Sequence, residues 1–218
     1  MLLKRILRAG LRLILKVRNF RSGQIKKHHE VGKWIEFLAS LSGVNTIIEI
    51  GTWNGAGSSM AIARGVVSRP KKDRDHVKVV GYEINPIMAK TARRRLARFG
   101  FFDVVYGSLV SIDDLDRSNL TQTEEQWLKQ DESWILGAPN VINSLPENLD
   151  LLILDGGEFS TLAEFNLLKE RVSDWIILDD TNTRKCAEIL KIIKYGNEFL
   201  TIYESKERNG TAILKRVK

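Results

Sequence analysis

One short stretch, residues 46–59, constrains the fold of this chain more than any other. Its sequence TIIEIGTWNGAGSS passes from an apolar run into three glycines and small polar residues, and a helix-compatible run follows from Met60. An apolar strand, a tight glycine turn and a helix form the entrance of a nucleotide-binding βαβ unit. Gly51 can adopt backbone angles that other residues avoid, and Gly55 and Gly57 let a ligand approach the main chain. We therefore expect a ligand at this turn.

The spacing of the glycines excludes two common classes of nucleotide site. A dinucleotide fingerprint needs G-x-G-x-x-G, whereas here the order is G-x-x-x-G-x-G and Met60 stands where the last glycine would be. A phosphate-binding P-loop needs Gly-Lys-Ser/Thr, which does not follow. A turn without any ligand is the remaining alternative. It is less favoured, because three glycines in one turn lower stability without a packing reason.

The stretch resembles the E/D-x-G-x-x-x-G-x-S motif of class I S-adenosylmethionine-dependent methyltransferases. This resemblance implies S-adenosylmethionine as the cofactor, and it implies that Glu49 orders the loop near the methionine end. It assigns cofactor binding in this segment to Glu49, Gly51, Thr52, Asn54, Gly55 and Ser58.

Length and composition indicate one globular domain behind a basic leader. The chain has 218 residues with 43% hydrophobic content, and its one cysteine excludes an internal disulfide and a cysteine-based zinc site. Residues 1–29 carry nine Lys/Arg and no acid, so the net charge of +7 becomes −2 over residues 30–218. We expect a leader of 1–29, a methyltransferase domain of 30–218, a cytoplasmic location, and no nucleic-acid partner.

Residues 2–18 predict a basic amphipathic helix. Apolar residues recur there at helical spacing, while lysines and arginines occupy the other positions. Such a helix can lie on an anionic membrane surface, here the inner surface, but charges every three or four residues prevent it from spanning. Packing on the domain or a partner and an organelle transit sequence are the alternatives. The oligomeric state stays open, a homo-oligomer included.

The remaining pattern predicts an α/β fold, namely a Rossmann-like doubly wound sheet with N-terminal helices before it. Apolar runs predict strands at 45–50, 77–82, 101–106, 149–154 and 174–178, and helices at 31–41, 56–67, 86–99, 161–171 and 183–195. Residues 198–204 and 210–217 resemble the closing antiparallel pair of the methyltransferase sheet, which makes seven mostly parallel strands. Residues 109–148 predict short helices over the carboxyl edge, a candidate lid in which Trp127 and Trp134 pack into the core.

Glu83 ends the second predicted strand, 26 residues after Gly57. A carboxylate at that place can accept hydrogen bonds from both hydroxyls of a ribose. Its alternative is an acidic group at the start of the next helix. Ile84 beside it, Ser108 at the rim where an adenine would lie, and Asp155 complete the predicted cofactor contacts.

Three carboxylates follow the fourth and fifth predicted strands: Asp155, Asp179 and Asp180. Neighbouring parallel strands end at one edge, so these acids should converge, and crowded carboxylates need a compensating charge. Mg²⁺ is the cation that such oxygen ligands favour, and a hydroxyl bound to it would attack the cofactor's methyl group more readily. Capping of the helix at 183–195 by Asp180 or Thr181 is the alternative.

Asp155, Asp179 and Asp180 also resemble the acids of one group of methyltransferases, the macrocin O-methyltransferase (TylF-like) and methyltransferase-24 group. This resemblance implies a Mg²⁺-assisted O-methyltransferase acting on a sugar, a glycan or a glycosylated small molecule. The group typically reads Asp-Gly-Asp-His after strand four, and this chain reads Asp-Gly-Gly-Glu at residues 155–158. The predicted catalytic residues are therefore Asp155 and Glu158. An RNA or other small-molecule methyltransferase and an inactive cofactor-binding interaction protein are the alternatives.

Overall fold

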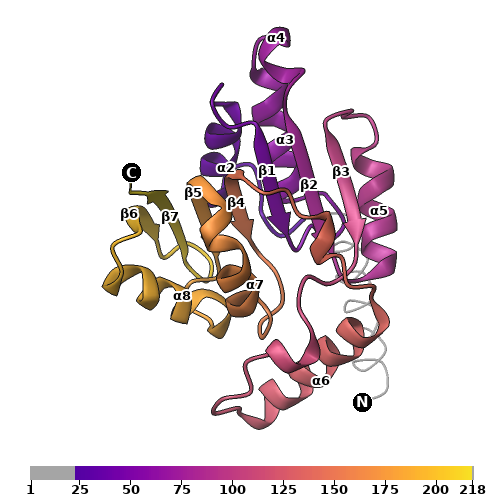
Figure 1. Ribbon diagram of the computed structural model, residues 1–218, viewed down its shortest axis with the longest axis vertical. Coiled ribbons are helices and arrows are strands. Elements are labelled where there is room, and N and C mark those ends of the chain that lie inside the picture. Colours follow the sequence, from indigo (N-terminus) through magenta and orange to yellow (C-terminus); the bar gives the residue numbers. More distant parts are fainter. Residues whose placement is uncertain (1–22, 218) are drawn as a thin grey trace, which may run out of the picture.

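The structure of the protein is a computed structural model that describes residues 23–217 (Figure 1). The helix expected at residues 2–18 lies outside the described residues. Among the described residues, no helix combines the length and the apolar character needed to cross a bilayer.

A seven-stranded sheet forms the centre of the molecule. Its strands in chain order are β1 (Thr46–Ile50), β2 (Lys78–Glu83), β3 (Phe102–Tyr106), β4 (Leu149–Leu154), β5 (Val172–Asp179), β6 (Phe199–Ser205) and β7 (Thr211–Arg216). Their spatial order is β3-β2-β1-β4-β5-β7-β6. The first five strands run parallel, and β7 is antiparallel to both of its neighbours. The predicted doubly wound sheet with an antiparallel final strand is confirmed.

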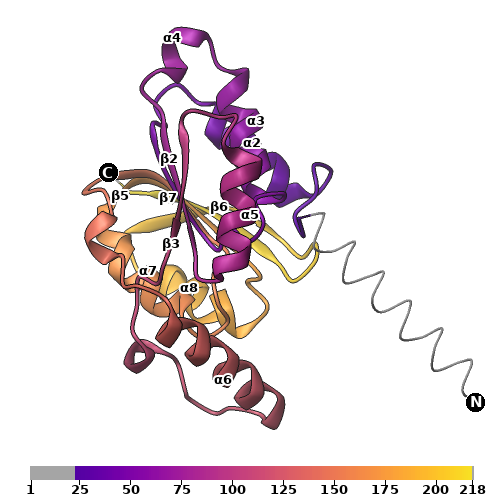
Figure 2. The same cartoon turned by 90° about the vertical axis from the view of Figure 1, so that its right-hand side faces the viewer.

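Helices cover both faces of this sheet (Figures 1 and 2). One face carries α2 (Glu30–Ser40), α3 (Ser58–Ser68) and α5 (Pro86–Leu96), and the other carries α6 (Gln122–Gly137), α7 (Thr161–Leu168) and α8 (Arg184–Tyr195). The short elements are α4 (Lys71–Arg74) and the 3-10 helices η1 (Ile112–Asp114), η2 (Ile142–Ser144) and η3 (Lys169–Arg171).

Successive side chains of the central strands point to opposite faces of the sheet, and this gives two hydrophobic cores, one on each face. In β1, Ile47 packs into the core beneath α2, α3 and α5, while Ile48 packs into the core beneath α6, α7 and α8. Ile25 belongs to the first core and is 4% exposed, although the predicted domain boundary puts it in the leader. The helices change face between β3 and β4, so the carboxyl ends of β1 and β4 lie side by side at the switch point.

The segment 109–148 differs from its prediction. Besides the short 3-10 helices η1 and η2, it contains one longer helix of 16 residues, α6. Thr121 and Glu124 form a capping box at its start, and the helix ends at Gly137. The expected core packing is wrong for Trp127, whose exposed fraction is 54%, whereas Trp134 lines a cavity.

Candidate active site

The turn after β1 requires a glycine at its first position, Gly51. Gly51 has φ +85°, and a Cβ added there would lie 1.9 Å from the carbonyl oxygen of Asp155. The N–H groups of Gly51 and Thr52 both donate to the carbonyl oxygen of Tyr82 at the end of β2. These contacts hold the ends of β1, β2 and β4 together. The strand-turn-helix pattern in the sequence predicted this turn at the same place.

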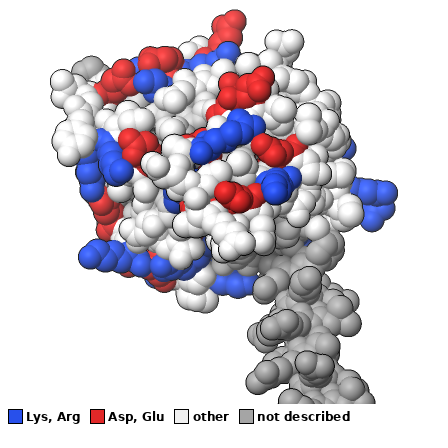
Figure 3. Space-filling model, turned by 90° about the horizontal axis from the view of Figure 1, so that it is seen from below, with Lys and Arg blue, Asp and Glu red and all other residues white. Residues whose placement is uncertain are grey.

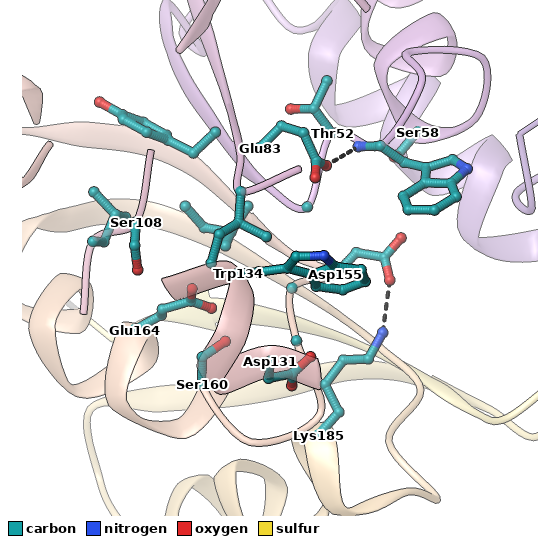
Figure 4. Close-up of a pocket in the computed structure, with 18 of the residues that line it drawn as sticks. Thr52, Ser58, Glu83, Ser108, Asp131, Trp134, Asp155, Ser160, Glu164 and Lys185 are labelled. Carbon is teal, nitrogen blue, oxygen red and sulfur yellow. Dashed lines mark hydrogen bonds and ion pairs between the residues drawn. The ribbon is translucent and has the colours of Figure 1, made fainter. Parts of the chain in front are cut away.

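Glu83 is held at the end of β2 by backbone donors. The N–H of Trp53 donates to Oε2 at 2.5 Å (Figure 4), and the N–H of Asn85 donates to Oε1 at 2.7 Å. Burial raises the pKa of Glu83 to about 7. The predicted alternative, an acidic group at the start of the next helix, is not what caps α5, because that cap is the side chain of Asn85. A carboxylate lining a cavity can accept hydrogen bonds from the hydroxyls of a ribose.

A cavity of about 220 Å³ opens between this turn, the end of β3 and α6. Most of the predicted cofactor residues line it: Gly51, Thr52, Asn54, Ser58, Glu83, Ile84, Ser108 and Asp155. Gly55 instead packs against Ala92 and Leu96 of α5. Glu49 lies beneath the turn, where it accepts a hydrogen bond from Ser59 Oγ at 2.6 Å, and burial raises its pKa to about 7.

Sequence reasoning missed the residues at the far end of the cavity. Asp131 and Trp134 come from α6 and Glu164 from α7, and in the view of Figure 4 the Trp134 ring lies between Glu83 and Asp131. Asp131 Oδ2 and Glu164 Oε2 are buried and have no hydrogen-bond partner among residues 23–217. Burial raises the pKa of Asp131 to about 6 and that of Glu164 to about 7. No local motif marks these positions, because only the packing of α6 over α7 brings them together.

The three predicted metal ligands do converge. One oxygen from each of Asp155, Asp179 and Asp180 lies within 4.8 Å of the others. Burial, with Asp155 nearby, raises the pKa of Asp179 to about 6. The capping alternative finds no support, because the N-cap residue of α8 is Thr183, and neither Asp180 nor Thr181 holds that position.

Two basic residues already compensate this cluster. Lys185 Nζ lies 2.8 Å from Asp155 Oδ1 and 2.7 Å from Asp180 Oδ2, and Arg208 Nη1 lies 2.9 Å from Asp179 Oδ2 (Figure 4 shows the first pair). Mg²⁺ requires a shell of oxygen ligands at about 2.0–2.1 Å. An ammonium group bonded to two of the three carboxylates takes up that space, so the side chains as arranged do not fit this ion. The expected compensating charge is present, but it comes from the protein.

The two predicted bases occupy different surroundings. Asp155 lines the cavity, whereas Glu158 does not. Glu158 Oε1 accepts a hydrogen bond from the backbone N–H of Lys185 at 3.2 Å, which satisfies a free donor at the start of α8. Lys185 itself could have been noticed in the sequence, because a cation in the first turn of a helix opposes the helix dipole.

Several solved methyltransferases have a similar architecture. A methyltransferase from Geobacter sulfurreducens has 16% identity and a TM-score of 0.62, covering 96% of this chain and 88% of its own. The O-methyltransferase from Bacillus cereus, in complex with SAH, has 17% identity and a TM-score of 0.61, covering 96% and 91%. The chain has the fold of these methyltransferases.

A third similar structure is the O-methyltransferase TomG from Streptomyces achromogenes, involved in tomaymycin synthesis and in complex with SAM. It has 16% identity and a TM-score of 0.59, covering 92% of this chain and 86% of its own. No protein-family model matches the chain, and no curated protein matches it in sequence. The broad resemblance is therefore confirmed for the fold, and the narrower one to the macrocin O-methyltransferase group stays a prediction.

Proposed function

We propose that the protein is an S-adenosylmethionine-dependent methyltransferase that methylates a hydroxyl oxygen of a small molecule. The observation that carries this proposal is the Glu83 carboxylate, fixed by two backbone donors beside the Gly51 turn. The fold shared with methyltransferases that bind SAH or SAM supports it.

The chain's own residues divide the work of the reaction. The cofactor supplies an electrophilic methyl group on its sulfonium sulfur. Glu83 holds the ribose, Ile84 and Ser108 flank the adenine, and the turn residues hold the methionine end. Asp155 faces the cavity and accepts the acceptor's proton, a role for which Glu158 is less well placed because it bonds to α8. Holding the acceptor oxygen and the methyl carbon in line would accelerate the transfer.

A hydroxyl-rich acceptor, such as a sugar, a glycan or a glycosylated small molecule, fits the far end of the cavity. Asp131 and Glu164 offer unpartnered carboxylate oxygens there, which hydroxyl donors can satisfy. The ring of Trp134 offers an apolar surface for the C–H face of a sugar. Magnesium assistance stays a prediction from the sequence, and no step of this proposal uses it.

Two alternatives receive less support. RNA methylation would favour a basic surface, but residues 30–218 carry a net charge of −2 and Figure 3 shows both signs interspersed over one face. An inactive interaction protein would bind the cofactor without turnover. A cytoplasmic location at the inner membrane surface, through residues 2–18, stays a prediction.

Calorimetry with S-adenosylmethionine tests the proposal first. The wild-type protein should bind the cofactor, and Glu83→Ala should weaken binding at least tenfold, about 1.4 kcal/mol. Glu147→Ala, an exposed glutamate outside the cavity, is the matched control. Mass spectrometry should then detect methyl transfer to sugar acceptors. Absence of cofactor binding to the wild type would end the proposal, and binding without any methylated product would favour the inactive alternative.

A further inference from the structure

Lys185 is an unusual residue for its position. It is the second residue of α8, where the helix dipole disfavours a cation, and its side chain is only 9% exposed. Burying an ammonium group is costly unless partners compensate it. Here Asp155 and Asp180 provide those partners at 2.8 and 2.7 Å.

We propose that Lys185 occupies the place of a divalent cation, so that this site handles its acceptor without a metal ion. An ammonium group has three N–H donors, and the two ion pairs use two of them. Lys185 also lines the cavity beside Asp155, which leaves its third donor for an oxygen bound there. Arg208 neutralises Asp179, the acid that Lys185 does not contact, so each of the three carboxylates has a cationic partner.

The catalytic part of this inference rests on the proposed function. As the acceptor oxygen bonds to the methyl carbon, the carbon–sulfur bond breaks and its electron pair returns to sulfur, which forms S-adenosylhomocysteine. The hydroxyl proton passes to Asp155. Lys185 stabilises the negative charge that develops on the oxygen, which is the task a metal ion performs in metal-assisted transfer.

Manganese binding, followed by electron paramagnetic resonance, tests the structural part without cofactor or acceptor. The full-length wild-type protein should bind no stoichiometric Mn²⁺. Lys185→Ala removes the ammonium and should gain one Mn²⁺ site, which a further Asp180→Asn change should abolish. Lys191→Ala, an exposed lysine of the same helix paired with Glu188, should gain none. Circular dichroism and the melting temperature report whether each variant is folded.

Several results would overturn the inference. One is stoichiometric Mn²⁺ binding to the wild type that Asp155→Asn removes. Another is the absence of any gain in folded Lys185→Ala and in Lys185→Met, which keeps most of the side-chain volume. If neither variant folds, the wild-type titration still decides the question. None of these results depends on whether methyl transfer is found, so failure here and failure of the proposed function are distinguishable.

Once an acceptor is known, EDTA should leave the wild-type rate unchanged. Lys185→Ala should lose about a hundredfold in kcat, and added Mn²⁺ should restore part of that loss. An EDTA-sensitive wild-type rate would contradict the inference.

Discussion

Glu83 combines two backbone hydrogen bonds with an environment that raises its pKa to about 7. Burial is the largest cause, and the nearby Asp155 adds to it. In the proposed complex the ionised carboxylate accepts both ribose hydroxyls, whereas a protonated one loses acceptor capacity. Cofactor binding should therefore require the ionised form.

This requirement predicts a pH-dependent affinity. The dissociation constant for S-adenosylmethionine should rise by up to about tenfold as the pH falls from 8 to 6, because protons then compete for Glu83. Calorimetry across this range measures the effect. Glu83→Gln should bind weakly with a flat profile, and Glu147→Gln should follow the wild type. A profile that stays equally steep in Glu83→Gln would assign the dependence to another group.

The raised pKa of Glu49 leads to a different prediction, a pH effect on the free energy of unfolding. Burial raises its pKa from 4.5 to about 7, and Oε1 has no hydrogen-bond partner. The folded protein therefore binds more protons than the unfolded chain between these values, so the free energy of unfolding should fall as the pH rises from 4.5 to 7. Glu49→Gln stays neutral and should remove part of this fall, on the order of 1–3 kcal/mol.

Urea unfolding at pH 5 and pH 8 measures the difference. The slope should shrink and not vanish, because the raised pKa values of Glu83 and Glu164 act in the same direction. A Glu49→Gln variant with the full wild-type slope would show that Glu49 stays ionised in the folded protein.

At the scale of elements, the β1–α3 turn depends on Gly51. An alanine there would need φ +85° and would place its Cβ 1.9 Å from the carbonyl oxygen of Asp155. Gly51→Ala should destabilise the protein by about 3 kcal/mol or more and abolish cofactor binding. Gly137→Ala is the matched control, because its Cβ meets nothing within 4 Å. Thermal unfolding and calorimetry should separate the two variants, and equal behaviour would disprove the strain.

The central elements were predictable from the sequence because their residues are buried on both faces. Apolar runs such as Leu149–Leu154 therefore located the strands, and glycines and acids after them located the turn and Glu83. The boundaries of α6 were missed although Thr121 and Glu124 form a recognisable capping box. Its apolar stripe is weak, since only Leu128 and Ile135 of this helix are buried.

The rest of the candidate site could not be predicted from local sequence patterns. Asp131 and Glu164 stand 33 positions apart on helices without motifs, and they meet only through the packing of α6. The positions of the acids at the ends of β4 and β5 predicted that they converge. The sequence did not predict which groups supply the compensating positive charge. Lys185 and Arg208 reach those acids from separate segments, so a metal ion was the simplest expectation before their positions were known.

For the whole molecule, the two parts of the chain differ in charge. Residues 1–20 carry six Lys/Arg and no acid, whereas residues 21–218 carry 28 Lys/Arg and 27 Asp/Glu, a net charge of +1. Each basic residue near an anionic membrane surface contributes about 1 kcal/mol at physiological salt. The apolar side chains of the predicted leader helix would also be buried at the boundary of the headgroups and acyl chains, which would strengthen membrane binding. A nearly neutral remainder gives no comparable attraction, so membrane binding should depend on residues 1–20.

Liposome co-sedimentation tests this dependence. Full-length protein should sediment with vesicles containing anionic lipid and should bind less to neutral vesicles or at about 0.5 M salt, where screening is strong. A variant without residues 1–20 should stay in the supernatant while binding S-adenosylmethionine as the wild type does, since it keeps every described residue that lines the cavity. Equal sedimentation of the two proteins would remove the leader's proposed role. Loss of cofactor binding in the shorter protein would instead tie the leader to the site.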